Sequence, residues 1–287
     1  MKNRFTNAMQ IKAYVKKQSA LNNIDPRLLI QEFVLDDLLE RISLSPYRDN
    51  LVLKGGFLIA SLLGIDTRST HDLDTTVVGM PINPNQLMSV FTKVCQIVPE
   101  DDPIELHPVK IERIRDDDKY GGYRVHFEGL IYGKIKPRIK IDVSTGDQIT
   151  PNAISYQHHL MTEDRTITIA AYNIETILAE KLETIISRGA TNSRSKDFYD
   201  LYALIKFEYQ NIDVDQLKLA LTNTAAHRRT LETLRDYQEI IADVMNDKDM
   251  NTRWHIYQRD NEFAKNISFQ DTCSTVVELL NEILKQK

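Results

Sequence analysis

Residues 51–78 read LVLKGGFLIASLLGIDTRSTHDLDTTVV, and this stretch decides the fold that we expect for the chain. It begins with three apolar residues, Leu51–Leu53, which predict a short buried strand. Gly55-Gly56 then stands directly before an apolar run, Phe57–Leu63, that predicts a short helix. A second strand is expected over Asp72–Val78, because residues that favour strands follow two aspartates there. The predicted order is strand, Gly-Gly, helix and strand.

Asp72 and Asp74 stand two residues apart near the start of this second strand. Side chains at that spacing leave the same face of a strand, with backbone positions roughly 6 to 7 Å apart. A third carboxylate, Asp142, lies in RIKIDV at residues 138–143, which predicts a central apolar strand. If all three meet in one cleft, each pair repels by on the order of 4 kcal/mol at about 4 Å and an effective dielectric near 20. A cation between the carboxylates is therefore expected.

Mg²⁺ is the ion that such an arrangement favours, and Mn²⁺ would use the same ligands. A hard ion of this kind binds one or two carboxylates and completes its shell with water and substrate phosphates. Two such ions, about 3.5 to 4 Å apart, can activate an attacking hydroxyl and stabilise a leaving pyrophosphate. We therefore interpret Asp72, Asp74 and Asp142 as metal ligands and catalytic residues that act on a nucleoside triphosphate.

Gly55 and Gly56 are then expected to contact the phosphates. Glycines at a helix N-terminus let backbone N–H groups approach a phosphate closely, and the helix dipole favours negative charge there. Taken alone, an Asp-x-Asp pair is common at strand ends and turns, and a Gly-Gly pair usually marks a tight turn. The order of strand, Gly-Gly helix, Asp-x-Asp strand and later single-Asp strand is what indicates a site.

Composition excludes several other classes of protein. The 287 residues, 42% of them hydrophobic, can bury the core of one large or two ordinary domains. No apolar run approaches the roughly 18 residues of a membrane span, and the N-terminus lacks the apolar stretch of a secretion signal. We therefore expect a cytoplasmic protein without membrane contact. Cys95 and Cys273 lack metal-ligand spacing and are expected to be buried thiols in a reducing compartment.

The net charge of −5 argues against a protein that coats nucleic acid with its whole surface. This charge does not exclude a local basic surface that binds nucleic acid, because alternating basic residues in a strand would project from one face. The alternative is a solvated sheet edge that discourages aggregation. The residues concerned are Lys134, Lys136, Arg138 and Lys140.

The rest of the sequence predicts an α/β unit followed by helices. Two helices are expected over residues 7–43, one over 84–98, and three strands over 104–143. One further strand, Thr166–Ala171, precedes a helical pattern that runs to the end of the chain. The two histidines at positions 158 and 159, just before that strand, are interpreted as surface residues.

These elements predict the fold class and the domain organisation. We expect an α/β (α+β) fold, with a catalytic lobe that contains a mixed sheet over residues 1–170 and a mainly helical lobe over residues 171–287. Helix starts are the clearest local signals. Asp25-Pro26 reads as a cap followed by a first-turn proline, and Ser268 with Asp271 resembles a capping box.

A lysine and two aspartates occupy unusual positions in the helical half. On a predicted helix over residues 174–188, Lys181 falls inside the apolar stripe, so it must have a partner. On the next helix, Asp197 and Asp200 also lie on the apolar stripe. One interpretation is a buried ion pair that links the two helices. The other makes Lys181 a phosphate ligand and Asp197 or Asp200 part of the acceptor or base machinery.

Other basic residues are candidate contacts for phosphate or RNA. Arg68, just before the acidic pair, could bind phosphate, although an arginine in a loop is more often solvated. Arg188, Arg194 and Lys196 flank a turn and could form a basic rim for triphosphate or RNA. The alternative is that they satisfy carbonyl groups at a helix C-terminus.

Five segments resemble the AbiEii toxin family of bacterial abortive-infection and toxin–antitoxin systems. They are LKGGFLIASLLG (53–64), TRSTHDLDTTV (67–77), IKIDV (139–143), AEKLETIISRG (179–189) and SRSKDFYDLYAL (193–204). The resemblance covers about residues 25–210. It implies the nucleotidyltransferase fold shared with DNA polymerase beta, in a two-lobed cytoplasmic enzyme that uses a nucleoside triphosphate and a divalent metal. One departure is Gly55-Gly56 where the wider superfamily has Gly-Ser, which removes a hydroxyl that would help to hold phosphate.

The resemblance also implies a function and a partner. Relatives add nucleotides to the 3′ acceptor end of tRNA and so stop translation, and a cognate antitoxin is encoded nearby. Lys54, Gly55, Gly56, Arg68 and Lys181 would then bind the nucleotide. The alternatives are transfer to a protein or small molecule, a non-catalytic nucleotide-binding module that arrests growth, and a metal-dependent nuclease.

Overall fold

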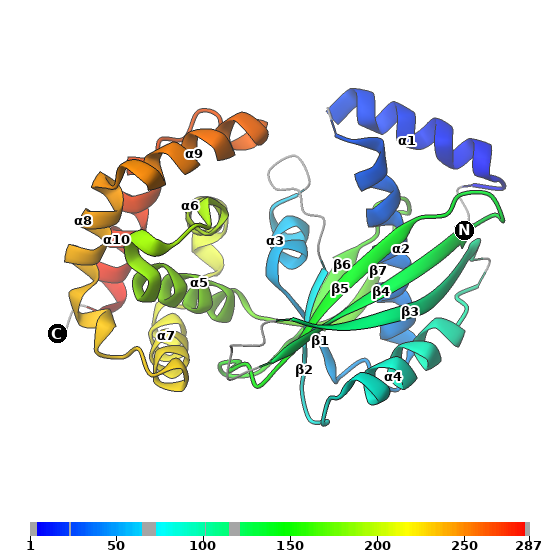
Figure 1. Ribbon diagram of the computed structural model, residues 1–287, viewed down its shortest axis with the longest axis horizontal. Coiled ribbons are helices and arrows are strands. Elements are labelled where there is room, and N and C mark those ends of the chain that lie inside the picture. Colours follow the sequence, from blue (N-terminus) through cyan, green and yellow to red (C-terminus); the bar gives the residue numbers. More distant parts are fainter. Residues whose placement is uncertain (1–4, 23, 65–72, 101, 115–120, 285–287) are drawn as a thin grey trace. The chain divides into compact units, whose positions relative to one another are not determined.

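A mixed sheet of seven strands is the centre of the N-terminal part of the chain in the computed structural model. The structure describes residues 5–22, 24–64, 73–100, 102–114 and 121–284, and within them the strand order is β3-β4-β5-β2-β1-β7-β6 (Figure 1). The strands are β1 (Leu51–Lys54), β2 (Leu73–Val77), β3 (Ile104–Ile114), β4 (Gly122–Ile131), β5 (Arg138–Thr145), β6 (Ile154–His159) and β7 (Thr166–Ala171).

Helices precede, interrupt and follow the strands. They are α1 (Ala8–Asn22), α2 (Pro26–Leu44), α3 (Gly55–Leu63), α4 (Pro84–Gln96), α5 (Ile174–Arg188), α6 (Ser195–Glu208), α7 (Val214–Arg228), α8 (Tyr237–Asn246), α9 (Lys248–Asp260) and α10 (Phe269–Leu284), with short 3₁₀ turns between the later ones. The predicted fold class, a mixed sheet followed by a mainly helical region, is confirmed.

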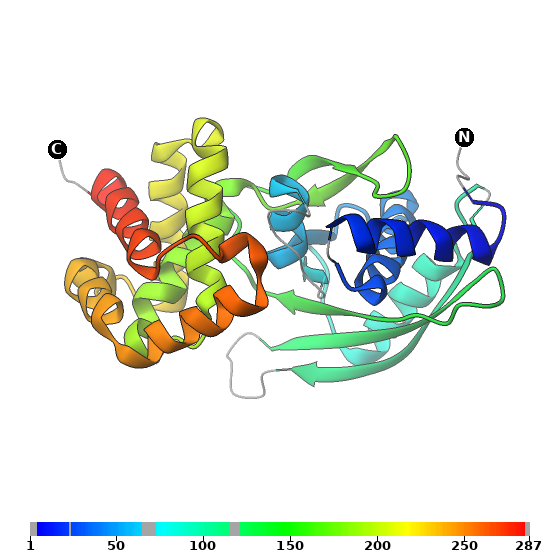
Figure 2. The same cartoon turned by 90° about the horizontal axis from the view of Figure 1, so that it is seen from above.

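The chain divides into two compact units. The main boundary falls between Ala171 and Tyr172, and, among the described residues, 62–64 and 148–153 also belong with the second unit. The first unit contains the sheet with α1, α2 and α4. The second contains α5 to α10 (Figure 2), where Trp254 of α9 packs against Phe269 of α10 with ring centroids 5.6 Å apart. Within the described residues, no helix is both long and apolar enough to cross a membrane.

One face of the sheet is apolar and covered by helices α2 and α4. Phe91 of α4 meets Phe127 of β4 edge to face, with ring centroids 5.4 Å apart. Phe127 pairs with Ile139 of β5, and every second residue of β5 on that side is buried. Because side chains alternate along a strand, Asp142 must lie on the opposite, polar face. The alternation in β5 therefore decides which face carries the candidate site.

The predicted helix starts are confirmed. Asp25 caps α2, its carboxylate accepting a hydrogen bond from the Arg27 N–H at 2.8 Å. Ser268 Oγ accepts a hydrogen bond from the Asp271 N–H at 3.0 Å at the start of α10. Both cysteines are buried, and burial raises the pKa of each thiol to about 12, so these thiols are unreactive at neutral pH.

The interpretation of His158 as a surface residue is wrong. Residues 154–159 form β6, an edge strand that the sequence did not predict, and it pairs antiparallel with β7. His158 is 4% exposed, whereas the neighbouring His159 side chain is exposed, as expected. The reason is that α2 supplies a buried carboxylate, Asp36, for the ring of His158.

The predicted strand through Lys134 and Lys136 is also wrong. Both lysines are exposed in a turn that precedes β5, and only Arg138 and Lys140 belong to the strand. Tyr132 and Gly133 take positive φ values of 48° and 64°, which breaks the extended conformation there. The predicted row of four basic side chains on one face of a strand is therefore absent among these described residues.

Candidate active site on the polar face of the sheet

Asp74 and Asp142 lie side by side on neighbouring strands. β2 and β5 are parallel, and their register pairs Asp74 directly with Asp142. Neighbouring strands lie about 4.8 Å apart, and paired residues point to the same face. Both side chains are partly buried. The structure thus brings together two of the three predicted carboxylates, while Asp72 and Arg68 lie outside the described residues.

Gly55 is required by the close approach of Asp74. Its φ is +68°, and a Cβ built on it would stand 2.1 Å from Asp74 Oδ2. The N–H of Gly56, at the start of α3, donates to the same oxygen at 3.4 Å. A carboxylate therefore sits at the helix N-terminus, where the helix dipole favours negative charge. The two glycines and Asp74 form one unit of structure.

Two basic side chains flank the carboxylates in the same row of the sheet. Arg124 of β4 pairs in register with Asp142, and Lys54 of β1 pairs with Asp74. The Arg124 guanidinium grips Asp142 at two points, Nε to Oδ1 at 2.7 Å and Nη2 to Oδ2 at 2.8 Å. Lys54, a predicted nucleotide ligand, donates to Asp147 at 2.5 Å. The row therefore reads base, acid, acid, base across β4, β5, β2 and β1.

Asp147 and Arg124 are site residues that the sequence reasoning missed. Burial raises the pKa of Asp147, but the charge of Lys54 and hydrogen bonds from Lys54, Ser144 and Thr76 outweigh burial and lower the pKa to about 2. Asp147 is therefore ionised at neutral pH. The alternation of polar residues along β4 could have placed Arg124 on the polar face, but its partner follows only from the strand register.

The residues present fit a divalent metal. Asp74 and Asp142 supply hard carboxylate oxygens from adjacent backbone positions, which is the donor type that Mg²⁺ prefers. Within the described part of the chain, no group of three or more His, Cys, Asp or Glu side chains could hold a metal ion. The third ligand of the predicted set is Asp72, which lies outside that part.

Lys181 joins two buried aspartates in the helical unit. Its Nζ, on α5, donates to Asp197 Oδ1 at 2.9 Å and to Asp200 Oδ2 at 2.7 Å, both on α6. Asp197 and Asp200 are 2% and 0% exposed. Burial lowers the pKa of Lys181, but the two carboxylates raise it by more than burial lowers it. The net pKa is therefore above its ordinary value, and the ammonium stays charged. The predicted partner of Lys181 is confirmed, and the cluster links α5 to α6.

The candidate RNA contacts lie around the turn between these helices. Arg188 and Lys196 are exposed, and Arg194 is half-buried. Arg194 Nε lies 3.1 Å from Asp197 Oδ2, so this arginine also neutralises the buried aspartate pair. Arg188 and Lys196 have side chains that solvent or a ligand can reach.

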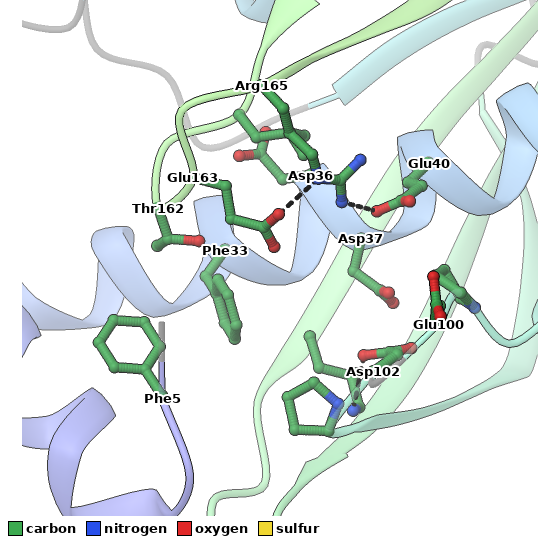
Figure 3. A pocket seen from close by; sticks show the side chains of 14 residues that line it. Phe5, Phe33, Asp36, Asp37, Glu40, Glu100, Asp102, Thr162, Glu163 and Arg165 are labelled. Carbon is green, nitrogen blue, oxygen red and sulfur yellow. Dashed lines mark hydrogen bonds and ion pairs between the residues drawn. The ribbon is translucent and has the colours of Figure 1, made fainter. Parts of the chain in front are cut away.

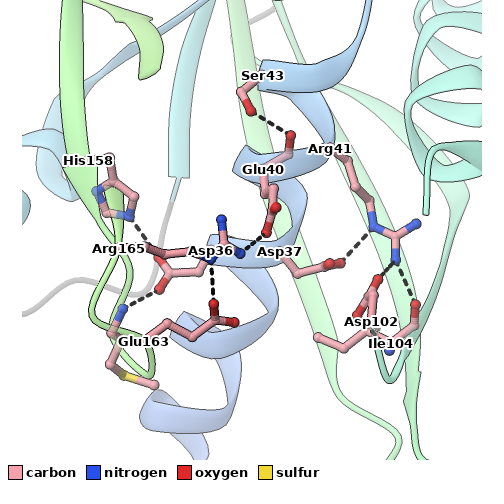
Figure 4. Close-up of polar contacts among 11 residues, drawn as sticks. Asp36, Asp37, Glu40, Arg41, Ser43, Asp102, Ile104, His158, Glu163 and Arg165 are labelled. Atoms are coloured by element: carbon pink, nitrogen blue, oxygen red, sulfur yellow. Dashed lines mark hydrogen bonds and ion pairs between the residues drawn. The ribbon is translucent and has the colours of Figure 1, made fainter. Parts of the chain in front are cut away.

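A buried polar network connects α2, β6 and α3 in the first unit. His158 Nε2 lies 2.8 Å from Asp36 Oδ1 (Figure 4). The Nδ1 atom of His158 lies 2.8 Å from Ser61 Oγ. Ser61 Oγ is also 2.8 Å from the hydroxyl of Tyr156. These hydrogen bonds connect Ser61 of α3, the helix that begins at Gly55, to Asp36 of α2 through His158. It supports the site rather than belonging to it.

A pocket in the same unit is lined by residues of α2 and of segments 99–104 and 160–165, and six of its fourteen lining residues are acidic (Figure 3). Arginine side chains of the protein already form ion pairs with several of these carboxylates. Arg165 donates to Glu40 at 2.5 Å, and the fully buried Arg41 binds Asp37 and Asp102 (Figure 4). Burial and Asp102 raise the pKa of Asp37 well above its usual range, against the opposing effect of Arg41. We interpret this cluster as part of the core.

Comparison with known proteins identifies the same kind of fold. The family model described as "Nucleotidyl transferase AbiEii toxin, Type IV TA system" matches residues 37–274. MenT4, a nucleotidyltransferase toxin from Mycobacterium tuberculosis, superposes with a TM-score of 0.55 at 15% identity, over 96% of this chain and 90% of that chain. A putative nucleotidyltransferase from H. pylori gives 0.50 at 18% identity, over 92% and 100%. At these identities the likeness shows the fold alone. No curated protein sequence matches the chain.

Proposed function

This chain belongs to the AbiEii family of nucleotidyl transferase toxins of type IV toxin–antitoxin systems, and we propose that it transfers a nucleotide from a nucleoside triphosphate to the 3′ end of tRNA. Such a transfer blocks the acceptor end and stops translation. Donor and acceptor are both cytoplasmic molecules, so the toxin would act in the cytoplasm. Membership of a toxin–antitoxin family implies a cognate antitoxin as partner.

The observation that carries this proposal is the pairing of Asp74 with Asp142 beside the Gly55-Gly56 start of α3. Two carboxylates at one register position hold the oxygens that a divalent ion needs. We propose that Asp74, Asp142 and Asp72 hold Mg²⁺ or Mn²⁺. When bound at such a site, a divalent ion lowers the pKa of an attacking hydroxyl and stabilises charge on a leaving pyrophosphate.

The protein's own groups would position the donor and acceptor. We propose that the N–H groups at the start of α3 and the side chains of Lys54 and Arg68 bind the triphosphate. The contact of the Gly56 N–H with Asp74 and the register pairing of Lys54 with Asp74 support this assignment. Asp142 would accept the proton of the acceptor hydroxyl. The hydroxyl oxygen would attack the α-phosphorus, and the bond from the α-phosphorus to the bridging oxygen would break, so that pyrophosphate leaves. Catalysis of this type rests on positioning and charge stabilisation, so no covalent enzyme intermediate is expected.

The helical unit carries further candidate contacts. We propose that Lys181 serves as a phosphate ligand and that Asp197 and Asp200 hold it in place and take part in acceptor binding. Arg188, Arg194 and Lys196 would contact the RNA backbone, because arginine and lysine are the usual partners of phosphate. The cluster already holds a charged lysine against two carboxylates, which supports a role that needs a fixed cation.

A labelled-nucleotide transfer assay tests the proposal. The purified protein would be incubated with each α-labelled nucleoside triphosphate and Mg²⁺, with total tRNA or with a cell extract freed of RNA. Label on tRNA supports the proposed acceptor. Label on protein or on a small molecule would keep the enzyme class and replace the acceptor. Triphosphate binding without pyrophosphate release would contradict catalysis and point to a nucleotide-binding module.

A further inference from the structure

Arg124 forms two hydrogen bonds with Asp142 and thereby occupies one edge of the carboxylate. Both oxygens accept hydrogen bonds from one guanidinium, at 2.7 and 2.8 Å. The two residues are register partners on β4 and β5, so the strand pairing keeps them opposite each other. Two-point, charge-assisted pairing of this kind is stronger than a hydrogen bond between neutral groups and fixes the geometry of the carboxylate. Asp142 is therefore engaged by a cation that belongs to the chain itself.

The charges around Asp142 explain why such a cation is present. Asp74 stands at the neighbouring register position, so two carboxylates repel each other on the same face. Lys54, the base on the other flank, also forms an ion pair with Asp147. Arg124 thus neutralises the acidic pair from the side of β4. A divalent ion that binds Asp142 through the same lone pairs must compete with Arg124.

We propose that Arg124 is a positioning residue that holds Asp142 through two hydrogen bonds, and that a divalent metal binds Asp142 by displacing the guanidinium from this carboxylate. The inference rests on the proposed function, because it presumes a metal at Asp74 and Asp142. The side chains of Arg124 and Asp142 are 30% and 22% exposed, so the pair can open without unfolding of the strand. Once released, the planar guanidinium remains beside the site, where phosphate oxygens match its fork of donors.

The proposal predicts that removal of Arg124 strengthens metal binding. Loss of a partly exposed ion pair corresponds to up to about 1 kcal/mol, or about a fivefold change in affinity. A residue that only supported the fold would have the opposite effect, because its loss would leave Asp142 less ordered. The direction of the change therefore separates a competing role from a structural one.

Mn²⁺ binding, followed by electron paramagnetic resonance in the absence of nucleotide, provides the test. Arg124→Gln should bind Mn²⁺ about fivefold more tightly than the wild type, and Arg124→Lys should fall between them, since lysine keeps the charge without the two-point grip. Arg138→Gln is the matched control. It removes a cross-strand ion pair, with Glu128, from the same two strands, at a side chain that is 83% exposed. Its affinity should stay within about twofold of the wild type.

The Asp142→Asn variant shows how much of the measured Mn²⁺ binding depends on Asp142. Circular dichroism checks that each variant is folded. Equal or weaker Mn²⁺ binding by folded Arg124→Gln, with measurable binding by the wild type, would overturn the role of Arg124 and leave the proposed function standing. Absence of Mn²⁺ binding at Asp142 in both proteins, with or without added triphosphate, would overturn both.

Discussion

Gly55 lies so close to Asp74 that a Cβ on the glycine would stand 2.1 Å from the carboxylate oxygen. The Gly55→Ala substitution should therefore displace Asp74 and also strain a backbone with φ +68°. Strain of this kind costs about 1 kcal/mol, and displacement of Asp74 should remove most of the transfer activity. Thermal unfolding and the transfer assay, run together, measure the two effects.

Gly133→Ala is the control for this prediction. Gly133 has a similar φ of +64°, but no atom lies within 4 Å of its built Cβ. The control should show the backbone strain without loss of activity. If Gly133→Ala and Gly55→Ala lowered activity equally, close packing against Asp74 would not explain the glycine.

Substitution of Lys181 by methionine should destabilise the helical unit strongly. Asp197 and Asp200 would then remain buried without their shared cation, and breaking a buried pair in this way costs about 3–5 kcal/mol. The free energy of unfolding in urea measures the loss. Lys206→Met, at an exposed lysine of α6, should change it by less than about 0.5 kcal/mol. Equal effects of the two substitutions would contradict the buried cluster.

The stability of the first unit should depend on Asp147 at low pH. Its pKa is lowered from the ordinary 3.8 to about 2, so the folded state binds its proton less readily than the unfolded state. Asp147 therefore stabilises the fold above about pH 4, and the contribution is lost as the pH falls toward 2. The shift corresponds to about 2 kcal/mol.

Urea unfolding of the wild type and of Asp147→Asn between pH 2 and pH 7 measures this contribution. The wild type should be the more stable of the two at pH 7, and the difference should shrink as the pH falls below about 4. Asp49→Asn, at an aspartate whose side chain is 85% exposed, is the control and should show little difference. A gap between wild type and Asp147→Asn that did not change with pH would contradict the ion pair with Lys54.

Much of the fold follows from local sequence signals. The caps at Asp25 and Ser268 and the β-favouring run after Asp74 define helix and strand starts without tertiary information. The partner of Lys181 was also predictable, since a lysine inside an apolar stripe needs a counter-ion. Pairing of Asp74 with Asp142 was inferred from motif order, and the strand register places the two residues side by side.

The errors come from contacts between segments far apart in the sequence. β6 was missed because polar residues dominate an edge strand, so its pattern resembles a loop. His158 is buried because Asp36 on α2 and Ser61 on α3 supply its hydrogen-bond partners, which no local pattern reveals. Arg124 escaped notice for the same reason, because its role depends on the register between β4 and β5.

The proposed function requires Asp74 and Asp142 to act together as a catalytic carboxylate pair. The most direct measurement is transfer of labelled nucleotide to tRNA by the wild type, Asp74→Asn and Asp142→Asn, with circular dichroism of each protein as the check on folding. We expect transfer by the wild type and a loss of about a hundredfold to a thousandfold in both variants, as is typical when charge stabilisation of a transition state is removed. Near-normal transfer by either folded variant would contradict it.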